Sequence, residues 1–458
     1  MNLHRPFLTL TIALALGTAV FAADAPAPAP WPTAPLTLKD ALELTLSRNP
    51  DLLKGKQDIE EAYGLAVQLR GVVTPKLSAS GAYNIIDEGR IEKVPFGAPG
   101  TAGVAFQKDQ NWNAGIGISQ PLYSGGKLTS SLRSAKLTKE AAVANYQALV
   151  ADTLLNVRIA YQDVLLAAEQ IVTQEASTEL LTKELTDTKR RYDAGTVPRF
   201  NVLRAEVELA NAKPKLFRAR SAYRIAKNNL ATLLGWNIPE NTGADIPLTL
   251  AGKLESEPYE TDLPSAIAKA VQHRPEITVR RLSEKLRKED VTQAKSGYIP
   301  TVSAVAGYGW VSRNFSPSLA DEVHGWSAGA VVNWDIWDFG ITQGKVSAAK
   351  ARQEKARIDT DDTFRRIEQE VRTAHSNFLE AKEVLESQAK VIEQGEEALR
   401  LANARADAGS GTQLDVLSAQ TALTDARTTY SQALRDYTVA RARLDRAMGE
   451  GTSLRAEK

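Results

Sequence analysis

The chain contains two copies of one long sequence pattern. Residues 112–235 align without a gap to residues 326–449 at a constant offset of 214, and an upstream stretch aligns at an offset of 225. The offset changes between Tyr83 and Trp112, where the first copy carries 11 more residues, so this segment is predicted to be a variable loop. A repeat of this length predicts two equivalent halves, related by a pseudo-twofold or lying side by side in a ring.

The duplication sets the expected organisation of the chain. Length alone would allow two or three domains, but the repeat favours one structure built from two halves. The expected segments are a signal segment at 1–23, a Pro/Ala-rich linker at 24–35, a first repeat at 36–235, an inter-repeat linker at 236–261, a second repeat at 262–449 and a short tail at 450–458.

The N-terminus is typical of a secretory signal. Arg5 precedes an apolar run over residues 7–22, and small residues follow, so cleavage after Ala22, Ala23 or Ala25 is expected. A retained membrane anchor is the less favoured alternative, because the run is short and a Pro/Ala-rich tract follows it. No other segment has 18 consecutive apolar residues, so any membrane insertion of the mature chain is not expected to use helices.

Composition argues against several classes of function. The chain has 56 basic and 55 acidic residues, which indicates no polyanion partner such as nucleic acid. It has no cysteine, which excludes disulfides, thiolate metal sites, a cysteine nucleophile and a lipid-modified N-terminal cysteine. The histidines lack metal-ligand spacing, and the sequence at 125–129 lacks the upstream glycine of a phosphate-binding loop. We therefore expect no enzymatic activity, no cofactor and no metal.

Long helices are predicted in both copies. Residues 127–193 contain neither proline nor glycine and show a heptad seam, which predicts a helix of roughly 100 Å. Gly195 is expected to end this helix as a left-handed cap. A second helix follows with large residues and alanine alternating on its seam, and Pro214 is expected to kink or interrupt it.

Between the helices the apolar period changes to two, which predicts four strands, two in each copy. They cover approximately residues 77–85, 112–122, 302–310 and 326–336. One face is apolar with aromatic residues near the ends, and the other carries Ser, Gly, Asn and Asp. A soluble sandwich and an outer-membrane barrel both fit this alternation. Strand length, terminal aromatic residues and the signal segment favour the barrel.

The barrel interpretation assigns the two faces. The expected lipid-facing residues are Tyr83, Ile116, Ile118, Tyr308, Trp310, Val332 and Trp334; the expected lumen-facing residues are Asn113, Ser119, Asn333 and Asp335. Four strands cannot close a barrel, because even the smallest single-chain barrels have eight. Other copies of the chain must therefore pair with the free edges.

The motifs that join strand to helix identify a family. Residues 119–127 read Ser-Gln-Pro-Leu-Tyr-Ser-Gly-Gly-Lys, and residues 334–340 of the second copy read Trp-Asp-Ile-Trp-Asp-Phe-Gly. Together with Asp407-Ala408-Gly409 and Leu414-Asp415-Val416-Leu417, they strongly resemble the TolC family of outer-membrane efflux ducts over roughly residues 36–449.

The resemblance implies a mostly α-helical α+β fold. It implies a homotrimer in which four strands per chain build a 12-stranded outer-membrane barrel, continuous with a periplasmic α-barrel of antiparallel coiled-coil helices. It also implies a passive exit duct for a tripartite efflux or type I secretion system, with a periplasmic adaptor and an inner-membrane transporter as partners.

The same resemblance places a gate at the helical tips. The residues expected there are Gly195, Asn201, Gly409, Asp415 and Ser418. Some members carry acidic residues at the positions of Asp415 and Ser418, so at most one aspartate ring is carried over to this chain. From the sequence itself, Thr412 and Asp415 have the spacing of a helix N-terminal capping pair, and Asp415 could cap its helix, line the mouth, or both.

The competing interpretation is a secreted periplasmic structural or adaptor protein, with long hairpins around a soluble β-domain. It would share the coiled coil and the signal segment. The sequence identifies neither the exported substrate nor the cognate transporter.

Overall fold

The computed structural model describes residues 34–91, 93–94, 104–105, 110–237, 243, 245–312 and 323–451. The expected signal segment at 1–23 and all but the last two residues of the linker at 24–35 lie outside the described residues, as does most of the tail at 450–458.

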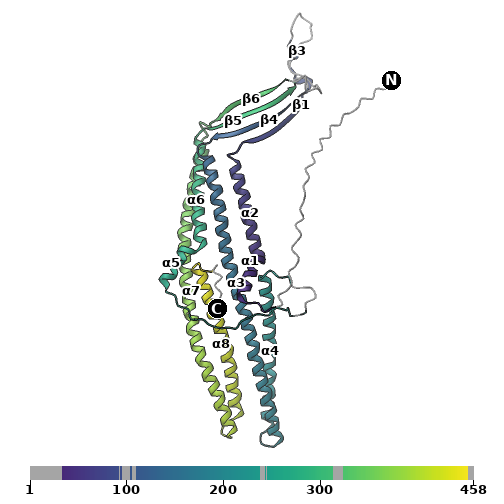
Figure 1. Ribbon diagram of the computed structural model, residues 1–458, viewed down its shortest axis with the longest axis vertical. Coiled ribbons are helices and arrows are strands. Elements are labelled where there is room, and N and C mark those ends of the chain that lie inside the picture. Colours follow the sequence, from purple (N-terminus) through teal and green to yellow (C-terminus); the bar gives the residue numbers. More distant parts are fainter. Residues whose placement is uncertain are drawn as a thin grey trace, which may run out of the picture.

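The molecule is elongated, with a β-sheet at one end and two helical hairpin tips at the other (Figure 1). Eight helices are described, most of them running along the long axis. They are α1 (Leu38–Arg48), α2 (Pro50–Gly71), α3 (Lys127–Asp193), α4 (Arg199–Leu233), α5 (Leu263–His273), α6 (Pro275–Lys295), α7 (Ile341–Asp407) and α8 (Gln413–Ala447), with short 3₁₀ turns at Glu88–Arg90 and Ser296–Tyr298.

The predicted long helices are confirmed. α3 spans 67 residues and α7, its counterpart in the second copy, spans 67 as well; α4 and α8 have 35 residues each. The expected interruption at Pro214 is wrong, because α4 continues through it. Proline removes one N–H donor, which leaves the carbonyl of Ala210 without its usual partner. Both residues lie on an exposed face, where that carbonyl stays open to solvent.

The helices form a curved layer whose neighbours change along the long axis. Near the sheet the order is α2, α3, α6, α7, and near the tips it is α4, α3, α8, α7. α3 and α7 therefore run through both parts, whereas α6 and α8 meet end to end between them. Within the described part of the chain, no helix combines the length and the apolar character needed to cross a membrane.

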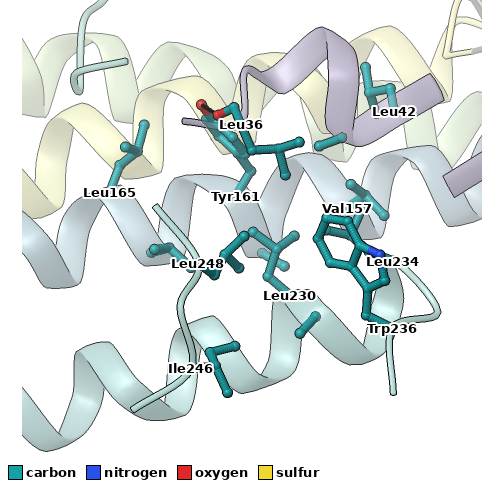
Figure 2. Packing of buried hydrophobic residues seen from close by; sticks show 14 of the residues in the cluster. Leu36, Leu42, Val157, Tyr161, Leu165, Leu230, Leu234, Trp236, Ile246 and Leu248 are labelled. Atoms are coloured by element: carbon teal, nitrogen blue, oxygen red, sulfur yellow. Dashed lines mark hydrogen bonds between the residues drawn. The ribbon is translucent and has the colours of Figure 1, made fainter. Parts of the chain in front are cut away.

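Two apolar cores lie near the middle of the layer. In the first, the predicted seam of α3 packs against α1, α4 and the segment after Trp236 (Figure 2). The buried Tyr161 hydroxyl is directed at the backbone carbonyls of Leu36 and Ala251, which ties the start of the first repeat and the inter-repeat linker to α3. The second core joins α5, α6, α7 and α8 and includes the fully buried Val371 and Leu444.

The sheet is antiparallel, with the order β1, β4, β5, β6. The four predicted strands are confirmed as β1 (Lys76–Ile85), β4 (Gln110–Tyr123), β5 (Thr301–Ser312) and β6 (Val323–Asn333). The predicted variable loop carries a small hairpin that the sequence pattern did not indicate, β2 (Lys93–Val94) with β3 (Val104–Ala105).

A buried ionic network fixes the junction between α6 and α8. The Arg446 guanidinium binds Asp152 of α3 at 2.7 Å and also contacts Glu276 of α6. Arg274 binds the same Glu276 at 3.1 Å and Glu370 of α7 at 2.6 Å. Both arginine side chains are only 5% exposed. Four helices are thus joined at one point, and Glu276 is the carboxylate that both buried guanidinium groups share.

We predict an acid-sensitive junction. Burial raises the pKa of Glu276, but hydrogen bonds from Arg274 and Arg446 outweigh that effect and lower it to about 2. Because the folded-state pKa is depressed, this stabilisation is fully present above the ordinary value of 4.5 and is lost as pH falls toward about 2. Glu276→Gln should lower the melting temperature at pH 6, and the free energy of unfolding should fall by about 1.5–3 kcal/mol, because Arg446 keeps Asp152 and Arg274 keeps Glu370.

The measurement is thermal unfolding by circular dichroism at pH 6 and pH 3. Glu276→Gln should show a smaller difference between the two pH values than the unchanged protein. Glu354→Gln is the matched control, since its partner Arg357 lies on the same exposed helix face. Equal pH dependence in all three proteins would contradict the assignment.

Candidate functional site

One face of the sheet collects the residues that were expected to meet lipid. Directly opposed residues of an antiparallel pair share a face. The register pairs Tyr83 with Trp112, Ile116 with Tyr308, and Tyr308 with Trp326. The same alternation adds the remaining members of this face, Ile118, Trp310 and Val332.

The other face carries small and polar side chains, together with Val305, Val311, Val323 and Val331. Ser119 lies opposite Lys76 and Val305, and Asn333 lies opposite Thr301. Asn113 also belongs to this face, and Asn111 of the same strand receives a hydrogen bond from the Asn84 amide at 3.1 Å. The sheet is therefore amphipathic across its width, and it projects from the end of the helical layer (Figure 1).

The expectation that Trp334 and Asp335 continue the last strand is wrong, because β6 ends at Asn333. Asn333 pairs with Thr301, and the next residue back in β5 would be Pro300, which has no N–H for the ladder. The Trp334 indole instead donates to the carbonyl of Tyr298 at 3.2 Å.

The two outer strands leave one edge each unpaired in the single chain. β1 pairs only with β4, and β6 only with β5, among the described strands. Every residue of β1 and of β6 is exposed. Such edges expose rows of backbone donors and acceptors that require partners wherever water is excluded.

The predicted strand-to-helix turn at Gly125–Lys127 is confirmed. Gly125 and Gly126 adopt φ of 58° and 90°, and α3 begins immediately after them. In the second copy Gly340 also has φ of 90°, and the Asp338 carboxylate accepts hydrogen bonds from the N–H groups of Gly340 and Thr342. The turn is a helix start in both copies.

The second tip holds its predicted capping pair. Gly409 has φ of 69° just after α7. The Asp415 carboxylate accepts from the Thr412 N–H at 2.9 Å, while the Thr412 hydroxyl oxygen accepts from the Asp415 N–H at 3.2 Å. The hydrogen bond from the Thr412 side chain is the main cause of a lowered pKa at Asp415. Asp415 therefore caps α8 as an ionised, exposed carboxylate, with Ser418 one turn further along.

The first tip is built differently. Gly195 has φ of 71° and ends α3, as predicted, but α4 begins after Pro198 with no side-chain cap. Asn201 lies in the first turn of α4, where Asp415 lies in α8.

Cross-contacts between the hairpins were not predicted. The Gln413 amide nitrogen donates to Thr188 at 2.5 Å and to Glu184 at 3.1 Å, which joins the start of α8 to the end of α3. Arg191 and Asp407 lie 3.5 Å apart and link the two tips directly. A heptad pattern shows which face is buried but not which distant helix covers it, so the sequence carried no signal for these pairs.

Above the tips, α3, α7 and α8 line an open groove of about 870 Å³. Its walls carry charges of both signs, among them Asp152, Glu370, Asp436, Arg366 and Arg443. No group of three or more metal-ligating side chains occurs in the part of the chain that the structure describes.

Comparison with known proteins accounts for this architecture. The family model described as "Outer membrane efflux protein" matches residues 41–236 and 266–450. The outer membrane protein TolC of Vibrio cholerae is 23% identical over 407 residues, covering 88% of each chain. The cobalt-zinc-cadmium resistance protein CzcC of Cupriavidus metallidurans is 23% identical over 416 residues, covering 91% of this chain and 90% of its own.

The fold is shared with a solved channel. The CmeC outer membrane channel of Campylobacter jejuni superposes with a TM-score of 0.77 at 17% identity, covering 92% of this chain and 87% of the channel. These matches favour an outer-membrane efflux duct over a secreted structural or adaptor protein. The chain belongs to the outer membrane efflux protein family.

Proposed function

We propose that three copies of the chain form one continuous passive duct, with a 12-stranded barrel in the outer membrane and a helical barrel in the periplasm. The observation that carries this proposal is the amphipathic four-stranded sheet with open edges at β1 and β6. In lipid those edges must be paired, and four strands are too few to pair them within one chain.

The apolar face has dimensions that suit a bilayer. Aromatic residues lie near both ends of it, with Trp326 in β6 and Trp334 directly after the last residue of β6. β6 has 11 residues, which at about 3.3 Å per residue gives a strand length of roughly 36 Å. The strands of a barrel are tilted, so the height that a strand spans across the membrane is smaller than its length. The apolar band of outer-membrane barrels is about 25 Å tall. The polar face, including Asn113 and Ser119, would then line the lumen.

We also propose that the two halves arose by internal duplication, with repeats at 36–235 and 262–449 joined by the linker at 236–261. The equal lengths of α3 and α7, and of α4 and α8, support this. In a ring, the contacts between the two repeats of one chain would then recur between neighbouring subunits.

The proposed partners are a periplasmic adaptor and an inner-membrane transporter, which would supply energy and much of the substrate choice. They would engage the helical tips, and the mouth would widen by a shift of coiled-coil packing. The contacts of Gln413 with the buried Thr188 and with Glu184 are polar and few, so the two tips are joined there by hydrogen bonds and not by a large apolar surface, which suits a mouth that opens and closes.

The trimer is tested by native mass spectrometry in detergent. We expect one dominant species with the mass of three mature chains. A stable monomer or dimer with an intact sheet would overturn the proposal, because its strand edges would remain unpaired.

The orientation of the sheet is tested by paired substitutions in β6. Val332→Arg would place a charge against lipid close to the end of β6, so it should cost less than the ~2–4 kcal/mol of a site at mid-membrane. Ser327→Arg lies on the opposite face and should be tolerated. The effect of each variant is measured as the yield of heat-modifiable trimer in outer-membrane fractions. Equal yields of the two variants would contradict the assigned orientation.

Substitutions at Asp415 separate capping from gating. Asp415→Ala should weaken the capping box and lower the melting temperature, because the Thr412 N–H loses its acceptor. It should also reduce cation preference in single-channel recordings, since up to three like charges leave one ring. Asp415→Asn is the control, because it retains an acceptor for the cap and removes only the charge. Unchanged ion selectivity in both variants would leave capping as the sole role.

A further inference from the structure

The start of α7 contains an unusual residue. Phe339 has φ of 51° and is the one non-glycine residue with positive φ in the part of the chain that the structure describes. Left-handed backbone is unfavourable for a bulky side chain. Its ring is also 90% exposed. The Asp338 carboxylate, bound to two following N–H groups, holds this conformation in place. A strained and exposed phenylalanine requires a reason outside the single chain.

The first copy shows what surrounds the matching position. At the offset of 214, Phe339 corresponds to Gly125, which has nearly the same φ of 58°. A Cβ on Gly125 would lie 2.8 Å from the Cβ of Ile299 and 3.2 Å from the carbonyl oxygen of Ser296. The start of α3 is thus pressed against the junction between α6 and β5, and only glycine fits there.

The second copy has no such neighbour within the chain. α3 packs against α6 of the next repeat, but α7 is the last helix of the layer near the sheet, and α2 is the first. At the offset of 225, the α6–β5 junction at residues 296–299 corresponds to residues 71–74 at the α2–β1 junction. Both α7 and α2 have open outer faces in the single chain.

We propose that Phe339 seats on the α2–β1 junction of a second copy of this chain, where it fills the space beside Thr74. The inference rests on the duplicated ring of the proposed function and identifies the contact that closes it. Within one chain the pair is Gly125 with Ile299, small against large. Between chains it becomes Phe339 with Thr74, large against small. The pair between chains is the bulkier of the two, and its larger residue lies on the helix-start side instead of the junction side.

Neighbouring positions fit the same contact. Within the chain, Ser130 donates to the carbonyl of Glu289 at 3.0 Å. Their counterparts are Gly344 on α7 and Gly64 on α2, two exposed helix glycines with no atom within 4 Å of an added Cβ. Glycine weakens an exposed helix by about 1 kcal/mol relative to alanine. Close approach of α7 to a partner's α2 gives both glycines a purpose.

One more pair extends the contact by a turn. Gly126 would bring a Cβ within 3.6 Å of Thr292, and the counterpart of Thr292 is Val67, which is 66% exposed on α2. Gly340, the counterpart of Gly126, has open space around it. A second copy of the chain would cover both Val67 and Gly340. Contact with lipid alone would not explain the helix glycines Gly64 and Gly344.

Cross-linking tests the contact directly. The chain has no cysteine, so Thr74→Cys with Phe339→Cys introduces the only two thiols. Purified in detergent and treated with a short bis-maleimide, this protein should give denatured bands at two and three chain masses. The control pair, Arg133→Cys with Glu289→Cys, replaces two side chains that meet at 2.8 Å between α3 and α6 of one chain, so it should link within the chain and give no ladder. If native mass spectrometry shows a trimer but the cross-linked bands at two and three chain masses are absent, the Phe339–Thr74 contact is wrong and the proposed trimer stands. The absence of any trimer overturns the proposed function and the contact with it.

Replacing Phe339 and Thr74 by the residues of the matching intrachain pair, Gly and Ile, provides a second test. Phe339→Gly relieves the strained backbone yet should lower the temperature at which the trimer dissociates in detergent, because a cavity opens at the interface. Thr74→Ile should lower it too by overpacking against Phe339. The double variant recreates the Gly125–Ile299 arrangement and should recover most of the loss. Additive losses in the double variant would show that the two residues do not touch.

Discussion

The unbroken length of α3 and α7 is the constraint on which the rest of the structure depends. Each helix runs for 67 residues from a strand end to a hairpin tip. All other long helices pack beside these two, and α6 and α8 meet end to end between them. A break in either helix would uncouple the sheet from the tips. Between α3 and α7 the layer is discontinuous, because α6 begins and α8 ends there. The ion pairs of the buried Arg274 and Arg446 with their carboxylates join α3, α6, α7 and α8 at this place.

Local pattern predicted the elements well, because their determinants are local. The absence of glycine and proline predicted α3, alternation predicted four strands, and Thr412 with Asp415 predicted a cap. The errors came from longer-range effects. β6 ends at Asn333 because Pro300 lies on the neighbouring strand, and Pro214 is tolerated because its surroundings are exposed. The Arg446 network and the Gln413 contacts join residues hundreds of positions apart, which periodicity within one helix cannot reveal.

The two copies share a scaffold and differ where their surroundings differ. Asn49 and Arg274 are equivalent at the offset of 225, and both are buried at a helix start. The Asn49 amide donates to the carbonyl of Leu233, whereas Arg274 binds two carboxylates. The junction at Asn49 in the first half is neutral, whereas the junction at Arg274 in the second half contains ion pairs. Acid should therefore destabilise the second half more than the first. Comparing matched positions of the two copies therefore identifies interactions, such as the Arg274 ion pairs, that occur in only one copy.

The tips show the same inequality, at the place where the proposed gate lies. α8 begins with a reciprocal cap, while α4 begins after Pro198 without one, so the first turn of α4 has fewer of its N–H groups satisfied by side chains. Gln413, which joins the hairpins, lies at the capped start. The start of α8 is therefore held by side-chain hydrogen bonds that the start of α4 lacks. Movement at the mouth should begin in the α3–α4 tip, since a rigid anchor and a looser partner concentrate displacement in the partner.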